Sequence, residues 1–116
     1  MSYDVNNIFA RILRQEIPCK KVFEDEKILA FHDICPRAPI HILIIPKGEY
    51  ISFHDFHSHA DAETVAHFYQ KVAEIAAEFK LDEAGYRVIA NCGLNGGQEV
   101  PHYHLHLLGG TKLGGF

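Results

Sequence analysis

The chain has 116 residues, of which 47% are hydrophobic and 22% are charged, and its net charge at pH 7 is −4. That length suits one domain with a single core, so we expect one domain over residues 1–116. The acidic balance argues against the basic surface that grips a nucleic-acid backbone. No stretch has the pattern of a signal peptide or the roughly 18 consecutive apolar residues of a membrane span. The three cysteines form no Cys-x-x-Cys pair and indicate reduced thiols in a cytoplasmic protein.

The N-terminal half is expected to hold one short helix and three strands. Apolar residues recur at helical spacing in NNIFARILRQEIP, after an asparagine that can cap the helix and before Pro18, and they predict a short amphipathic helix. KKVFEDEKILAFHD indicates two short strands joined by the polar turn EDEK, with Phe31 and Asp33 on one face of the second strand. PIHILIIPKG is the most apolar of the expected strands, and it places His41 on one face with Leu43.

The C-terminal half is expected to hold one long helix and two strands. ADAETVAHFYQKVAEIAAEFK, from about residue 60 to 80, carries an apolar stripe at helical spacing, with Asp61 near its start and Gly85 beyond its end. GYRVIAN and HYHLHLL predict strands on either side of the glycine-rich loop CGLNGGQEV. Strands that follow one another through short loops favour an α+β fold, an antiparallel sheet of about five strands with one short N-terminal helix and one long helix.

Nine histidines are the oddity of the composition, and three of them alternate in VPHYHLHLLGG. On a strand, His102, His104 and His106 would point the same way, while Tyr103 and the leucines would face the core. The outer two histidines would stand about 13 Å apart, so one zinc ion would reach all three only with difficulty and would need a further ligand such as His41. Three hydrogen-bonded histidines in a half-exposed sheet are the plainer structural interpretation.

Anion chemistry explains this row of histidines best. Imidazole N–H groups, together with the backbone amides of Gly96 and Gly97, can hold a phosphate. A neutral imidazole is also a nucleophile when the N–H of one ring nitrogen donates a hydrogen bond to an acceptor and the other nitrogen keeps a free lone pair. The middle histidine, His104, has a neighbour on each side to bind the oxygens of a phosphorus centre. The spacing therefore predicts a nucleophile between two donors.

HYHLHLL resembles the signature of the histidine triad (HIT) superfamily, three histidines that alternate with apolar residues. The similarity extends to IFARILRQEIPCKKVFEDEKILAFHDICPRAPIHILIIPK and RVIANCGLNGGQEVPHYHLHLLGG, which resemble the two halves of the histidine-triad nucleotide-binding (Hint) branch. It is weakest between residues 49 and 80.

This resemblance implies a HIT-like fold and the activity of a purine nucleoside phosphoramidase. Such a hydrolase cleaves the phosphorus–nitrogen bond that joins AMP, GMP or a similar purine nucleotide to an amine such as lysine, through a nucleotidyl-histidine. The resemblance also implies that no metal or other cofactor is required. It further implies a homodimer whose sheets join edge to edge, and the long apolar helix is consistent with an interface.

The resemblance assigns a role to each matching residue. His104 would attack phosphorus, His106 would bind the phosphoryl oxygens, and His102 and His41 would belong to the supporting hydrogen-bond chain. A second set would bind the nucleotide: Asn91, Gly97 and Glu99 at the phosphate, Asp33 at the ribose hydroxyls, and Ile8, Phe9, Ile12, Phe31 and Ile34 around the purine. By pattern alone the apolar members of this set are as readily core residues, and Asp33 is as readily a turn residue.

Three features stand apart from the resemblance. Glu99 lies where several relatives carry a serine near the leaving amine, and its carboxylate would repel a phosphate unless it is protonated or turned away. Pro101 lacks an N–H and predicts an irregular entry to the last strand. HDFHSH is a second histidine cluster; we expect it in a solvated loop, although three imidazoles can collect a transition metal.

Other functions stay open at this point. Dinucleoside polyphosphate hydrolysis, the activity of a neighbouring branch of the superfamily, would use the same nucleophile. The non-enzymatic alternatives are a nucleotide-binding adaptor and a zinc-binding regulator. Stoichiometric zinc without nucleotide affinity would identify the regulator.

Overall fold

The computed structural model describes residues 2–116, and within them it has five strands and four helices. In chain order these are α1 (Ile8–Leu13), β1 (Lys21–Glu24), β2 (Ile28–His32), β3 (Ile40–Pro46), α2 (Phe53–His59), α3 (Ala62–Glu78), α4 (Leu81–Ala84), β4 (Arg87–Ile89) and β5 (Leu105–Gly109). The strands form one antiparallel sheet in the order β1-β2-β3-β5-β4. The predicted α+β fold with a five-stranded antiparallel sheet is confirmed.

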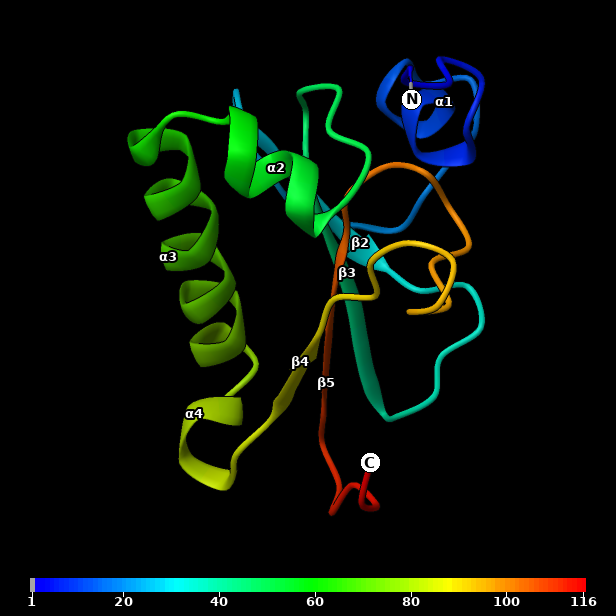
Figure 1. Ribbon diagram of the computed structural model, residues 1–116. Coiled ribbons are helices and arrows are strands. Elements are labelled where there is room, and N and C mark those ends of the chain that lie inside the picture. Colours follow the sequence, from blue (N-terminus) through cyan, green and yellow to red (C-terminus); the bar gives the residue numbers. More distant parts are fainter. Residues whose placement is uncertain (1) are drawn as a thin grey trace.

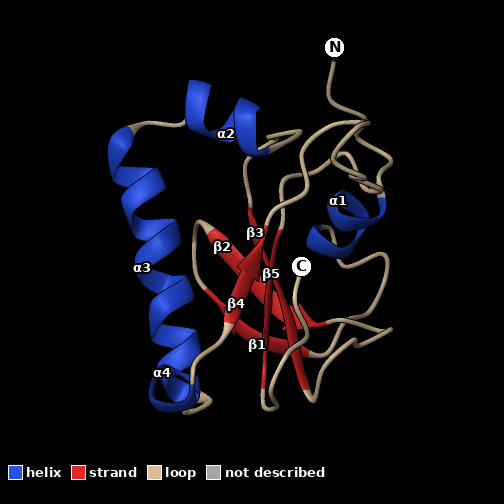
Figure 2. Ribbon diagram, turned by 60° about the horizontal axis from the view of Figure 1, so that its bottom comes forward, coloured by secondary structure: helices blue, strands red, loops and turns tan. Residues whose placement is uncertain are grey.

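The sheet is covered on both faces, by α3 on one side and by α1 on the other (Figures 1 and 2). The larger apolar cluster joins α3 to alternate residues of the central strands, such as Ala30, Ile42 and Leu107. The smaller cluster joins α1 to the residues in between, such as Phe31 and Leu43. Because β2 and β3 bury side chains on both faces, they read as nearly continuous apolar runs. No helix within residues 2–116 is long and apolar enough to cross a membrane.

Capping side chains start the helices where the sequence predicts. The Asn7 side chain accepts a hydrogen bond from the Ala10 amide at 2.9 Å, and Asp61 accepts from the Thr64 amide at 2.7 Å. The apolar stripe of α3 packs against the sheet of its own chain. Gly85 lies at φ 101° and ends the short helix α4 instead of α3.

HDFHSH forms helix α2, and the expectation of a solvated loop is wrong. Ser52 caps this helix by accepting from the Asp55 amide at 3.1 Å, and the Asp55 carboxylate accepts from the Ile51 amide at 2.7 Å. Phe56 is fully buried against α3 and Tyr103, whereas His54 faces solvent. One anchoring phenylalanine and a cap are too little pattern to reveal a two-turn helix in the sequence.

The last strand is shorter than predicted, because β5 begins at Leu105 and only His106 of the triad lies within it. The ladder with β3 stops near Pro46, which has no N–H to extend it. Beyond that point the Tyr103 amide donates to the Tyr50 carbonyl at 2.7 Å, outside the sheet. The irregular entry that Pro101 predicts is therefore present, and it allows the first two histidines to leave the regular strand geometry.

Candidate active site

Four histidines gather on the face of the sheet that carries α1. His41 lies in β3 and His106 lies in the neighbouring strand β5, while His102 and His104 approach from the segment just before β5. The Phe9 ring of α1 stands edge-on to the His104 ring, with the centroids 4.9 Å apart. The triad histidines are hydrogen-bonded, as the plainer structural interpretation expects, but His102 and His104 are buried and only His106 is half-buried.

The hydrogen bonds of His104 determine which of its nitrogens can react. Its Nδ1 lies 2.8 Å from the main-chain carbonyl oxygen of His102. A carbonyl oxygen can only accept, so Nδ1 carries the proton and donates it. In the neutral ring Nε2 then has a free lone pair, which is the state that a nucleophile requires.

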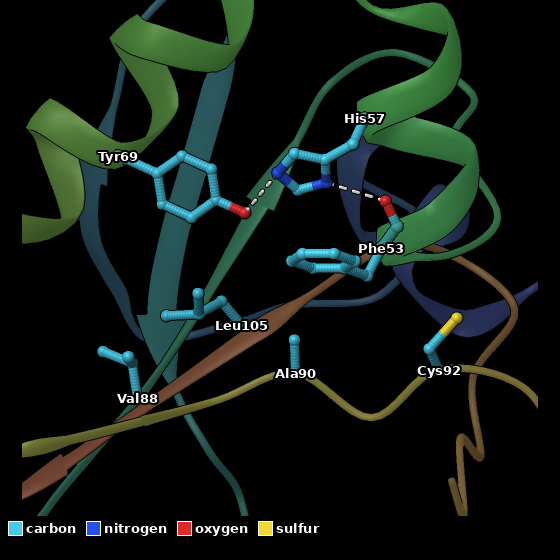
Figure 3. Close-up of a pocket in the computed structure, with 7 residues that line it drawn as sticks. All are labelled: Phe53, His57, Tyr69, Val88, Ala90, Cys92 and Leu105. Atoms are coloured by element: carbon cyan, nitrogen blue, oxygen red, sulfur yellow. Dashed lines mark hydrogen bonds between the residues drawn. The ribbon is translucent and has the colours of Figure 1, made fainter. Parts of the chain in front are cut away.

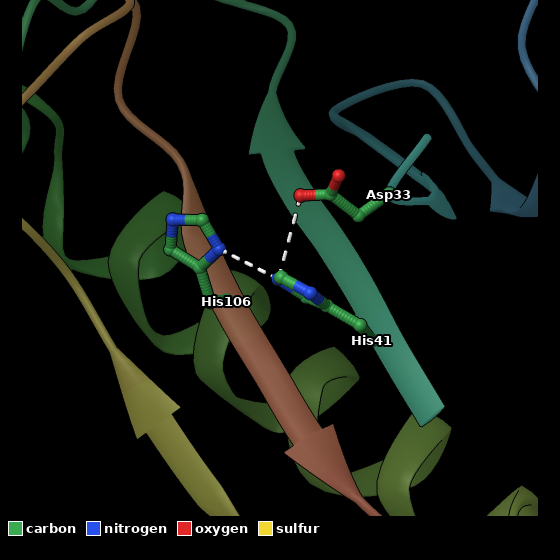
Figure 4. Close-up of side chains that lie close together, drawn as sticks. All are labelled: Asp33, His41 and His106. Carbon is green, nitrogen blue, oxygen red and sulfur yellow. Dashed lines mark hydrogen bonds and ion pairs between the residues drawn. The ribbon is translucent and has the colours of Figure 1, made fainter. Parts of the chain in front are cut away.

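The same reasoning fixes the protons of His41 and His106, whose side chains face each other in Figure 4. The Arg37 backbone N–H donates to His41 Nδ1 at 3.0 Å, so the proton of neutral His41 is on Nε2. His41 Nε2 donates to His106 Nδ1 at 2.9 Å. His106 must then carry its own proton on Nε2, and it is a donor suited to an anionic oxygen.

Burial favours the neutral form of all four rings. It lowers the pKa of His104 below its ordinary value, and the nearby carboxylates of Asp33 and Glu99 oppose this shift. Burial, helped by the neighbouring rings of His104 and His41, lowers the pKa of His106 to about 4. The pKa of His102 falls to about 4 and that of His41 falls as well, both mainly because of burial. At neutral pH the site therefore holds uncharged imidazoles with defined tautomers.

Asp33, His41 and His106 together have the composition of a divalent-cation site. One ligand atom from each lies within 4.8 Å of the others, and His41 Nε2 is 3.4 Å from the nearer Asp33 oxygen. A metal ligand needs a lone pair, however, and because the Arg37 amide donates to His41 Nδ1, the proton of the neutral ring lies on Nε2, the nitrogen that faces the cluster. Binding a cation here would break that hydrogen bond, so the arrangement suits proton donation better than metal binding.

The residues expected at the phosphate and the ribose differ in their surroundings. The Asp33 carboxylate accepts from the Cys35 amide at 2.8 Å and lies beside His41. Asn91 follows the end of β4 by two residues and lies outside the ladder that pairs β4 with β5. Gly97, at φ 77°, uses its amide to donate to the Leu94 carbonyl, so that amide is not a free phosphate donor in this conformation. Glu99 is exposed and acts on His104 through its charge.

The apolar residues expected around a purine divide into two groups. Phe9, Ile12 and Phe31 are buried in the smaller core cluster beside the histidines. Ile8 and Ile34 are exposed, Ile34 almost completely. The structure thus brings Phe9 against the His104 ring, with Phe31 edge-on to Phe9, and it leaves Ile8 and Ile34 exposed.

Sequence reasoning missed two groups that shape the site. The Arg37 main chain orients His41, and no side-chain pattern can reveal a backbone donor. Gln98 holds the glycine-rich loop in place, because its Oε1 accepts from the Gly93 amide while its Nε2 donates to the Ile51 and Val100 carbonyls. Its position directly after the two glycines was the available signal for that role.

The opposite face of the sheet holds an apolar hollow of about 490 Å³ beside the edge strand β4 (Figure 3). It is lined by Phe53, His57, Tyr69, Val88, Ala90, Cys92 and Leu105. His57 Nδ1 donates to the Phe53 carbonyl, and the Tyr69 hydroxyl donates to His57 Nε2 at 2.9 Å. Within HDFHSH, His57 and His59 thus bond to their own helix while His54 faces solvent, and within residues 2–116 these histidines do not belong to a cluster of three metal-ligand groups.

Comparison with known proteins gives a consistent result. The HIT domain model matches residues 14–113. An uncharacterised 13.2 kDa HIT-like protein of Azospirillum brasilense is 53% identical over 113 residues, which cover 97% of this chain and 93% of the relative. A histidine triad protein from Clostridium difficile has a TM-score of 0.89 at 43% identity and covers 99% of both chains. A HIT family hydrolase from Legionella pneumophila has a TM-score of 0.87 at 46% identity and covers 92% of this chain and 95% of that one. The chain belongs to the HIT domain family.

Proposed function

We propose that this protein is a hydrolase that cleaves the P–N bond of purine nucleoside 5′-phosphoramidates, AMP joined to an amine such as lysine. The observation that carries the proposal is the state of His104, a buried neutral ring whose Nδ1 proton is held by a carbonyl and whose Nε2 lone pair is free. The related Legionella pneumophila protein is described as a hydrolase, which supports this class of reaction.

The reaction proceeds in two displacements at phosphorus. His104 Nε2 forms a bond to phosphorus while the bond from phosphorus to the amine breaks, and the amine leaves with a proton taken from solvent. Water then attacks phosphorus, the bond to His104 breaks, AMP is released, and the water's proton passes to solvent. In both steps His106 Nε2–H donates to the phosphoryl oxygen on which charge builds, and His41 holds His106 in the donating tautomer.

Binding of the nucleotide follows from the groups around His104. Asn91, in the segment after β4, donates to the phosphate, and Asp33 accepts from the ribose hydroxyls. Ile8, Ile34, Phe9, Ile12 and Phe31 form the apolar surround of the purine. Gly97 supports the loop at the phosphate, and Glu99 lies on the side of the leaving amine.

The decisive experiment compares a fluorogenic adenosine phosphoramidate with a diadenosine polyphosphate, using the native chain and His104→Ala. We expect the phosphoramidate to be strongly preferred, and the substitution to reduce kcat by a factor on the order of 10³ or more while AMP still binds. The exposed helix residue His54, changed to alanine, is the matched control and should leave turnover unchanged. Full activity of His104→Ala, or adenylate that never becomes attached to this ring, would refute the assignment, and a preference for the polyphosphate would favour the neighbouring branch.

We also propose that the protein works in the cytoplasm as a homodimer, with each chain a single domain. The outer strand β1 carries Lys21 and Glu24, which pair with each other, and Glu24 also pairs with Lys47, so this edge is protected by charge. The other outer strand, β4, has Val88 half-exposed beside the apolar hollow. Although β4 also carries Arg87, which donates to the Gly114 carbonyl, its apolar surface suits pairing with β4 of a second copy. The three free cysteines agree with a reducing compartment.

A further inference from the structure

The first histidine of the triad, His102, is completely buried, and its ring nitrogens bond to groups outside the triad. Its Nε2 lies 2.8 Å from the Pro46 carbonyl oxygen, which can only accept a hydrogen bond. Nε2 therefore carries the proton, and Nδ1 carries a lone pair that needs a donor in this dry environment.

Tyr3 supplies that donor. Its hydroxyl lies 2.5 Å from His102 Nδ1, and its ring stands edge-on to the imidazole with the centroids 5.6 Å apart. Tyr3 reaches the site from the segment before α1. This segment is held in place because the Asn7 backbone and side chain both donate to the Asp4 carbonyl. The position of the hydroxyl is thus built into the fold of the N-terminal segment.

We propose that Tyr3 is a positioning residue for the His104 nucleophile, acting through His102. The Tyr3 hydroxyl donates to His102 Nδ1, His102 Nε2 donates to Pro46, and the His102 carbonyl accepts the Nδ1 proton of His104. The residue whose ring Tyr3 locks is therefore the residue whose main chain sets the tautomer of the nucleophile. Tyr3 lies outside the residues that the HIT domain model matches. The catalytic part of this proposal rests on the proposed function.

Loss of the hydroxyl has a specific consequence for the reacting ring. Without it, a buried ring nitrogen lacks its donor, and the His102 ring gains the freedom to turn or to change tautomer. The carbonyl on which His104 depends then moves, and part of the His104 population loses its free Nε2 lone pair. A misplaced nucleophile lowers the rate of the bound complex more than it weakens substrate binding.

The test uses Tyr3→Phe, which removes only the hydroxyl, and Val5→Ala as the matched control in the same segment. Val5 is half-exposed, and its side chain has no part in the chain of hydrogen bonds. On the adenosine phosphoramidate we expect Tyr3→Phe to lower kcat roughly tenfold with KM changed less than about threefold, and Val5→Ala to match the native chain. A general loss of packing would change the thermal melting of both variants without this division between kcat and KM.

Nitrogen NMR of the histidine rings gives a second readout that does not depend on turnover. In the native chain at pH 7 we expect His102 to be protonated on Nε2 and His104 on Nδ1, and we expect Tyr3→Phe to shift both His102 Nδ1 and His104 Nε2. Native His102 protonated on Nδ1 would overturn the proposal even if the variant fails to fold. Unchanged His104 resonances and an unchanged kcat in folded Tyr3→Phe would also overturn it. If the native chain cleaves no phosphoramidate, the proposed function fails, while the NMR result still decides whether Tyr3 positions His104.

Discussion

At the scale of single residues, main-chain groups set the tautomers of the histidines on which the proposed reaction depends. The His102 carbonyl accepts a hydrogen bond from the Nδ1–H of His104. The Arg37 amide sets the tautomer of His41, and His41 in turn donates to His106 Nδ1, which leaves the His106 proton on Nε2. One ring is left with a free lone pair and the adjacent one with a free N–H. With the proton on Nε2, His104 would be a poor nucleophile. With the proton on Nδ1, His106 would be a poor donor to an anionic oxygen.

The depressed pKa of His104 predicts the acid side of the pH profile. Protonation removes the nucleophilic lone pair, and burial lowers the pKa of His104, so activity should fall only at a pH below the ordinary histidine pKa near 6.5. Glu99 stabilises the protonated ring, so Glu99→Gln should lower the pKa further and move the acid limb of kcat/KM to lower pH. The measurement is kcat/KM on the phosphoramidate from pH 4 to 8. An acid limb above 6.5, or one that Glu99→Gln moves upward, would contradict this account.

At the scale of elements, α2 packs both against α3 and against the segment that carries the triad. It lies at the end of the sheet between α3 and the segment that carries the triad (Figure 1). Its Phe56 ring stacks on Tyr103, the residue between His102 and His104, with the centroids 5.0 Å apart. The Tyr69 and Tyr103 hydroxyls, 2.7 Å apart, join α3 to the same point. The aromatic packing on one face of the sheet thus supports the backbone that displays the histidines on the other.

Phe56 should therefore be among the most important residues of α2 for stability. Because its ring is fully buried, we expect Phe56→Ala to reduce the free energy of unfolding by roughly 3–5 kcal/mol. His54→Ala on the exposed face of the same helix should change it by less than about 0.5 kcal/mol. Urea titration followed by circular dichroism measures both. Equal effects of the two substitutions would show that α2 is not anchored through Phe56.

At the scale of the whole molecule, the two edge strands of the sheet, β1 and β4, expose different kinds of side chain. The β1 edge is guarded by ion pairs, whereas β4 exposes Val88 close to the half-exposed Phe53 and the hollow of Figure 3. The long helix is already used by the core of its own chain. The surface that we propose for a second copy is the β4 edge and the hollow, to whose lining α3 contributes Tyr69.

Val88→Glu should disrupt the proposed homodimer, because a carboxylate would be buried without a partner between two apolar surfaces. We expect light scattering after size-exclusion chromatography to give the mass of a dimer for the native chain and of a monomer for the variant at micromolar concentration. Val5→Glu, which places the same charge on a half-exposed valine far from β4, is the control. A native monomer, or a Val88→Glu dimer, would exclude this edge as the interface.

The sequence by itself determined the sheet, the two predicted helices and the identity of the triad. These depend on local periodicity and on residue types in fixed order, both of which can be read along the chain. Only the tertiary structure decided that HDFHSH is helical, that the last strand begins at Leu105, and which nitrogen of each histidine carries a proton. The physical reason is that a cap, the end of a strand ladder or a tautomer depends on the group that each atom faces. Tyr3, Arg37 and Pro46, which supply those groups, are brought to the triad only when the chain folds.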